Sequence, residues 1–304
     1  MKVRRRRFRN ATGNATALGM ISDLRSDLRL AAFCALAAVP FLGAGAARAE
    51  LMSDWSSPVG TAVRLVAGAP DGKAVTGGVE IRLTPGWKTY WRYPGDSGVP
   101  PHFDWSGSQN VENIEVLWPA PVRFDDGGSF SIGYKRDVVI PFRVIPRDAG
   151  KPVELRLNLD FAVCEKICQP ASASLTLDVP SDGAAPSPPM LVNALATVPR
   201  TTQIGAAGEP AIASAELREG GDGPSIHIEA HVADAAKADL FVEGPNEDWA
   251  LPLPSRETGP DGRTVFVLPV DGVPKGADIA ATKLRFTLVD GNRAVEVDAP
   301  LSAR

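Results

Sequence analysis

The chain has 304 residues and a formal net charge of −4, with 32 Lys and Arg against 36 Asp and Glu. This length is enough for one large domain or two ordinary ones. The mildly acidic balance argues against nucleic acid and anionic membrane surfaces as partners. After residue 49 no segment is apolar over the roughly 20 residues that a bilayer-spanning helix needs.

The first 49 residues have the layout of a cleavable secretory signal peptide. Basic residues precede an apolar run over residues 30–42, and the segment ends in Ala47-Arg-Ala49. We expect cleavage after Ala49 and a periplasmic mature chain, with Met1 or Met20 as the start of translation. Cleavage removes nine Lys and Arg and two Asp and Glu, which takes the formal charge to −11.

Residues 50–181 are predicted to form an all-β domain. Apolar and polar residues alternate there in short runs, which is typical of strands with one buried face. Turn signals rich in Pro, Gly and Asp separate these runs, as expected for an antiparallel β-sandwich. The predicted strands cover residues 79–83, 138–144, 155–163 and 175–179.

A composition rich in Pro, Ser and Ala over residues 181–189 predicts a linker. The whole linker region is placed at residues 182–210 and includes a short helix at residues 190–198, which Pro199 ends. Alternation resumes afterwards, and residues 211–304 are predicted to form a second, smaller β-sandwich. Its predicted strands cover residues 215–218, 225–232, 239–242, 264–268, 283–288 and 294–297.

The aromatic residues at positions 87–93 lie beside a Pro-Gly turn signal, so we interpret them as core and corner packing. Trp87 and Trp91 are candidates to brace the cysteine loop described next.

Cys164 and Cys168 are four residues apart, and they are the two thiols that remain once Cys34 is removed with the signal peptide. In an oxidising compartment such a pair forms a disulfide. The pair follows a predicted strand that ends at Val163, and the next strand is predicted to begin near Ser174. A disulfide needs Cα atoms about 4.4–6.8 Å apart, whereas four extended residues span more than about 13 Å, so the segment must turn.

Three interpretations of this pair remain open from the residues alone. The first interpretation is a disulfide that exchanges with other thiols. A disulfide that closes so short a loop stabilises by well under the roughly 3 kcal/mol of a 15-residue loop, and short exposed disulfides are those that exchange. A structural disulfide is the second interpretation. A metal site is the third, but zinc prefers four ligands at characteristic spacings, and His102, His227 and His231 are scattered. We expect no metal and no cofactor.

Four motifs in this order resemble the N-terminal periplasmic domain of the thiol:disulfide interchange protein DsbD family. The resemblance is closest to the branch found in membrane reductases of the suppressor-of-copper-sensitivity type. It covers about residues 55–180, and the second predicted sandwich lies outside it or only loosely inside. The motifs are residues 86–101, 118–124, 133–142 and 164–170.

The resemblance implies an immunoglobulin-like domain that relays electrons by thiol–disulfide exchange. A membrane-embedded thiol reductase would be the donor, and periplasmic thioredoxin-like proteins would be the acceptors. Cys168 would be the exposed nucleophile and Cys164 the resolving thiol. The family also has a cap loop over the cysteines, for which Phe124, Asp126 and Phe130 are the candidates here. Cytochrome c biogenesis and copper tolerance are the settings that the family implies.

Two departures from the family pattern keep a second function open. Fewer residues separate the cysteines than in the best-known members, and the membrane-spanning and thioredoxin-like parts of the family are absent from this sequence. A separate protein would therefore have to reduce the pair. The alternative is a non-enzymatic periplasmic β-sandwich that binds a polypeptide or copper and has a structural disulfide.

Overall fold

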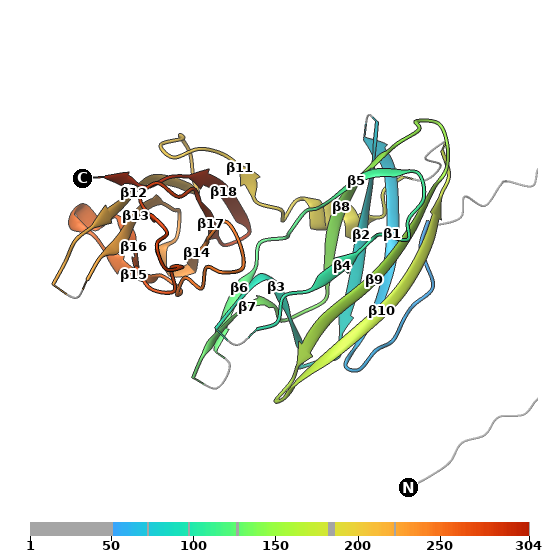
Figure 1. The fold of residues 1–304 in the computed structure, drawn as a ribbon, viewed down its shortest axis with the longest axis horizontal. Helices are drawn as coiled ribbons and strands as arrows, with labels where there is room; N and C mark the ends of the chain where they lie inside the picture. Colours follow the sequence, from blue (N-terminus) through green and yellow to red (C-terminus); the bar gives the residue numbers. More distant parts are fainter. Residues whose placement is uncertain are drawn as a thin grey trace, which may run out of the picture. The chain divides into compact units, whose positions relative to one another are not determined.

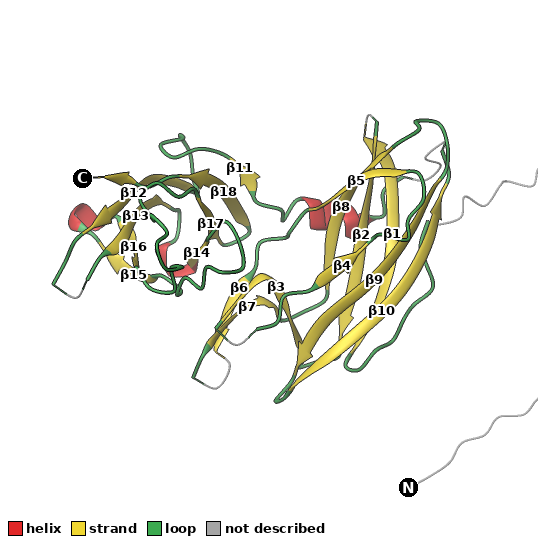
Figure 2. Ribbon diagram, viewed as in Figure 1, coloured by secondary structure: helices red, strands yellow, loops and turns green. Residues whose placement is uncertain are grey.

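The computed structural model describes residues 51–303 except positions 72, 97, 126–127, 182–185 and 222. The predicted signal peptide, with Cys34 and the cleavage site after Ala49, lies outside the described residues. Strands dominate the described part of the chain and form four sheets (Figures 1 and 2). A search of the same residues found no helix with the length and apolar character needed to cross a membrane.

Two antiparallel sheets built from residues 61–179 form an immunoglobulin-like sandwich, which confirms the predicted fold class. The first sheet has the order β1 (Thr61–Asp71), β2 (Ala74–Leu83), β8 (Val138–Pro146) and β5 (Val111–Val116). The second has the order β10 (Cys168–Val179), β9 (Val153–Cys164), β3 (Lys88–Gly95), β7 (Phe130–Tyr134) and β6 (Val122–Asp125), and β4 (His102–Asp104) also pairs with β9.

The alternation predicted for β9 is confirmed, and it explains how this sandwich forms its core. Leu155, Leu157 and Leu159 are buried, while the residues between them are exposed or half-buried. Fully burying a side chain of this size contributes about 1.5–3 kcal/mol. The facing sheet supplies Ile81, Ile140 and further apolar residues to the same core.

Two further sheets are built from residues 200–303, and here too β-strands were predicted. One sheet has the order β11 (Arg200–Thr201), β18 (Arg293–Ala299), β17 (Leu284–Asp290) and β14 (Ala238–Glu243). The other has the order β15 (Ser255–Thr258), β16 (Thr264–Pro269), β13 (Ser225–His231), β12 (Ala211–Arg218) and β19 (Ser302–Ala303). Between them lies a core that includes Ile228, Phe266 and Phe286. We call this part of the chain the C-terminal sandwich. Two 3-10 helices, η1 (Ala235–Lys237) and η2 (Pro260–Gly262), lie in its connections.

Two boundaries differ from the sequence-based expectations. The linker helix α1 spans Pro189–Leu195 and so ends before residue 198, because the last turn tightens and Thr197 donates its backbone N–H to Ala194. Strand β10 begins at Cys168 rather than near Ser174. The sequence did not predict this early start because Pro170 lacks a backbone N–H. Strand β10 is an edge strand, however, and a proline is tolerated there because no second strand would pair with that N–H.

Candidate functional site

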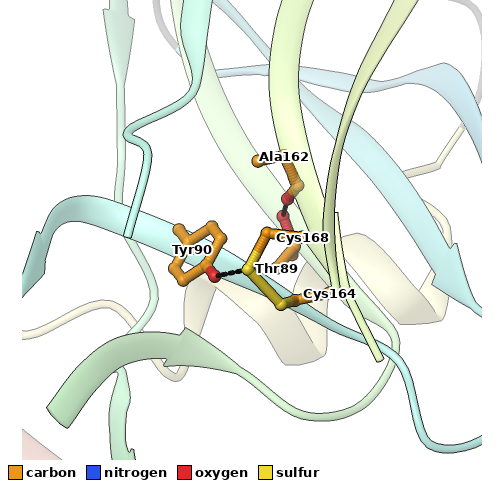
Figure 3. Close-up of a disulfide and its surroundings, with 5 residues drawn as sticks. All are labelled: Thr89, Tyr90, Ala162, Cys164 and Cys168. Atoms are coloured by element: carbon orange, nitrogen blue, oxygen red, sulfur yellow. Dashed lines mark hydrogen bonds between the residues drawn. A yellow bond between two sulfur atoms is a disulfide. The ribbon is translucent and has the colours of Figure 1, made fainter. Parts of the chain in front are cut away.

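Cys164 and Cys168 form a disulfide at the tip of the β9–β10 hairpin (Figure 3). They are direct cross-strand partners, as the last residue of β9 and the first of β10, and their Cα atoms are 4.1 Å apart. The segment therefore turns, as its short span required. Glu165, Lys166 and Ile167 form the exposed loop between them, and Ile167 is 75% exposed.

The two cysteines differ sharply in exposure. Cys164 is 1% exposed, because β9 lies between β10 and β3 and Lys88 of β3 pairs with Cys164 on the side away from β10. Cys168 is exposed, because β10 is the edge of its sheet. A molecule in solution can therefore reach Cys168 far more readily than Cys164.

Tyr90 of β3 contacts the exposed cysteine. Its hydroxyl oxygen lies 3.0 Å from Cys168 Sγ (Figure 3). A disulfide sulfur has no hydrogen, so in this state the hydroxyl is the donor. The neighbouring Thr89 donates from Oγ1 to the carbonyl oxygen of Ala162 at 2.9 Å, which ties β3 to β9 beside the disulfide. Tyr90 itself is buried, so its hydroxyl is held in place toward the sulfur.

A glycine on β7 allows this arrangement. Gly133 pairs with Tyr90 across the sheet, and a Cβ at position 133 would lie 2.1 Å from the backbone oxygen of Thr89. Any side chain there would force β3 and β7 apart. The placement of Tyr90 therefore depends on a residue that carries no side chain.

Of the three predicted cap residues, the structure brings Phe124 to the cysteine pair. Phe124 is 4% exposed and belongs to one buried cluster with Tyr90, Ala162 and Cys164. Phe130 lies on the same hairpin but is 44% exposed and is not part of that cluster. Asp126 lies outside the described residues.

Two lysines add positive charge at this site. The ammonium of Lys88 is 5.0 Å from the centroid of the Phe124 ring, and that of Lys135 is 6.0 Å away. Cations over an aromatic face are attracted by its negative charge, typically by about 0.5–1 kcal/mol at exposed sites. Nearby cations also favour the thiolate form of a cysteine, which is the form that attacks a disulfide.

Sequence reasoning missed Tyr90 and placed its emphasis on the neighbouring tryptophans. Trp91 is fully buried and packs against Phe241, with ring centroids 5.8 Å apart, and Trp87 packs against the core of the first sandwich. The predicted bracing of the cysteine loop therefore falls to Tyr90. The pairing of β3 with β9 could have indicated Tyr90. A strand that begins at Lys88 and pairs there with Cys164 places Tyr90 near the end of the β9–β10 hairpin.

Among the described residues no group of three or more His, Cys, Asp or Glu side chains lies close enough together to hold a metal ion. His227 contacts the Ser225 hydroxyl at 3.1 Å and the Arg218 guanidinium at 3.4 Å.

Comparisons with known proteins agree with this geometry. Residues 57–180 match the family model of the thiol:disulfide interchange protein DsbD, N-terminal, and residues 197–304 match a domain of unknown function, DUF8393. A search of curated proteins gave no match. A similar solved structure is the N-terminal periplasmic domain of ScsB from Proteus mirabilis, with a TM-score of 0.64 and 24% sequence identity.

That structural match covers 84% of this chain and 99% of the ScsB domain, so the shared fold extends beyond the first sandwich. The resemblance predicted from four sequence motifs is confirmed over residues 57–180, which match the DsbD N-terminal family model.

Proposed function

We propose that this protein is a periplasmic thiol–disulfide exchange module. It takes electrons from a membrane-embedded thiol reductase and passes them to thioredoxin-like proteins through Cys164 and Cys168. The observation that carries the proposal is the difference in exposure within the disulfide: Cys168 is exposed at a sheet edge, and Cys164 is 1% exposed. Exchange needs one sulfur that a partner can reach and a second sulfur that resolves the mixed disulfide.

Electron transfer to an acceptor takes two steps. In the reduced protein the thiolate of Cys168 attacks a sulfur of the acceptor disulfide, which forms a mixed disulfide and releases one acceptor thiolate. The thiolate of Cys164 then attacks Sγ of Cys168, which restores the internal disulfide and releases the second acceptor thiolate. The acceptor gains two electrons and, with two protons from solvent, becomes a dithiol.

The residues around the pair fit these steps. A hydroxyl donor such as Tyr90 stabilises negative charge on Cys168 Sγ when that sulfur becomes a thiolate, because hydrogen bonds to ionised groups are stronger than neutral ones. Phe124 and Cys164 belong to one buried cluster, so the resolving sulfur is kept away from solvent oxidants until a partner binds.

A purely structural role explains the disulfide less well. Strands β9 and β10 are each twelve residues long and pair along their whole length, so the hairpin already holds its two ends together. The disulfide encloses only the short loop between two cysteines with a sequence separation of 4. On the chain-entropy model it restricts the unfolded chain much less than the roughly 3 kcal/mol of a 15-residue loop.

The reduction potential of the pair tests the proposal. Equilibration with glutathione buffers, read by alkylation and mass spectrometry, should give a value between about −120 and about −270 mV, the range of exchange proteins. The double variant Cys164→Ser/Cys168→Ser provides the blank. A value below about −300 mV would identify a structural disulfide and would contradict the proposal.

A further inference from the structure

One face of strand β14 in the C-terminal sandwich contacts the first sandwich, which contains the disulfide. Asp239, Phe241 and Glu243 are two residues apart from one another, so they lie on the same face of the strand. The alternate residues Leu240 and Val242 face the core of the C-terminal sandwich. Asp239 and Glu243 are acidic and Phe241 is apolar. Each contacts a residue on β3 or β6, the strands that carry Tyr90 and Phe124.

Asp239 binds the strand that carries the cap residue. The Arg123 guanidinium donates through Nη2 to Asp239 Oδ1 at 2.7 Å and through Nε to Oδ2 at 3.1 Å. Arg123 also donates from Nη1 to the backbone oxygen of Pro254 at 3.1 Å. Paired N–H···O bonds between a guanidinium and a carboxylate fix orientation as well as distance. The residue next to Arg123 is Phe124, whose side chain points to the opposite face of β6 and belongs to the buried cluster that contains Cys164.

Phe241 and Glu243 bind the strand that carries Tyr90. Arg92 donates to Glu243 at 2.7 and 2.9 Å and also to Glu296 of β18, and these three side chains are at most 20% exposed. Trp91 packs against Phe241. A single strand therefore contacts both β3, immediately after Tyr90, and β6, immediately before Phe124.

We propose that the C-terminal sandwich is a brace that sets access to the disulfide, and that the Arg123–Asp239 pair holds Phe124 closed over Cys164. This assigns a role to the segment that matches a domain of unknown function. Arg123 and Asp239 are positioning residues, because they touch neither cysteine and act through Phe124. The inference rests on the proposed function for its biological meaning, since it concerns access to the same cysteine pair.

The test compares how fast iodoacetamide alkylates Cys164 in the full chain with the substitution Cys168→Ser, which leaves Cys164 as a free thiol. In this background Asp239→Asn keeps the size of the side chain but removes the charge, and we expect the alkylation rate constant of Cys164 to rise about tenfold, which corresponds to about 1.4 kcal/mol of closing free energy. Glu229→Gln is the matched control, because it breaks another ion pair of the C-terminal sandwich, Glu229–Arg263 at 3.0 Å. It should leave the rate unchanged.

Two further measurements separate bracing from a general loss of stability. The reversed pair Arg123→Asp/Asp239→Arg should return the rate toward that of the wild type. Amide hydrogen exchange in Asp239→Asn should quicken in β6 but not in β10. If Asp239→Asn does not fold, Asp239→Glu serves for the same comparison. A Cys164 alkylation rate in the Asp239 variant within twofold of the rate with Asp239 intact would overturn the inference.

Failure of this inference and failure of the proposed function are distinguishable. The brace is tested by a ratio of Cys164 alkylation rates between variants with a small reagent. The proposed function is tested by the reduction potential and by exchange with a protein partner, so either result stands without the other.

Discussion

Truncation of Phe124 to alanine probes the cap in the most direct way. Phe124 is 4% exposed, and its ring closes a small cluster that contains Tyr90 and Cys164. Full burial of a phenylalanine side chain stabilises by about 1.5–3 kcal/mol. If about 2 kcal/mol of this favours the closed cap, its loss raises the population that exposes Cys164 roughly thirtyfold, since each 1.4 kcal/mol is a factor of ten.

The assay is alkylation of Cys164 by iodoacetamide under pseudo-first-order conditions in a Cys168→Ser background, with the modified protein counted by mass spectrometry at each time point. Far-UV circular dichroism checks that each variant is folded. We expect Phe124→Ala to react about thirtyfold faster than the wild type if the whole of the lost burial energy acts on the cap.

Phe130→Ala is the matched control for this experiment. Phe130 lies on the same β6–β7 hairpin, but it is 44% exposed and outside the cluster. Its truncation should change the alkylation rate of Cys164 by less than a factor of about two, as for surface substitutions of small energetic effect. The reasoning is refuted if the two alanine variants react at the same rate, or if Phe124→Ala is no faster than the wild type.

Three other predictions follow from the same geometry. Tyr90→Phe removes the donor 3.0 Å from Cys168 Sγ; it should slow alkylation of the reduced protein at neutral pH roughly tenfold, because a hydrogen bond to a charged group is worth about 1.5–3 kcal/mol, and an unchanged rate would exclude this role. Gly133→Ala places a Cβ 2.1 Å from a backbone oxygen; it should lower the midpoint of thermal unfolding and disturb the NMR signals of Tyr90, whereas Gly221→Ala, where a Cβ meets nothing within 4 Å, should leave the Tyr90 signals unchanged. Burial, with the charges of Glu243 and Asp96, raises the pKa of Tyr93 to about 12; the folded state thus holds this proton more tightly than the unfolded chain, so stability is complete below about pH 10 and is lost as the pH rises toward 12, and chemical denaturation should show a smaller loss in Tyr93→Phe than in the wild type.

The sequence was sufficient to predict the elements whose signals are local. The alternation of leucines from Leu155 to Leu159 identified β9, and the same pattern identified six strands of the C-terminal sandwich but not the short strands β11, β15 and β19. The predicted cleavage of a signal peptide left Cys164 and Cys168 as the expected pair, and their short spacing required a turn. The aromatic Phe124 came from family resemblance, since nothing in its neighbours indicates that it lies beside a cysteine.

The rest depended on contacts between residues far apart in the chain. Tyr90 and Cys168 are 78 residues apart, and they meet only because β3 and β10 lie on either side of β9. Arg123 and Asp239 are 116 residues apart, and a sequence with many charges of both signs does not reveal which of them pair. Strand order and the approach of one sandwich to another are set by packing of whole faces, which no short window of sequence contains.

Trapping of the mixed disulfide tests the central claim, exchange through Cys168, most directly. The Cys164→Ser variant is exported to a bacterial periplasm, the cells are quenched in acid and alkylated, and the proteins are separated without reductant. We predict a covalent adduct between Cys168 and a thioredoxin-fold protein, and no adduct with Cys168→Ser. Absence of an adduct with Cys164→Ser, or equal adducts with both variants, would contradict the account.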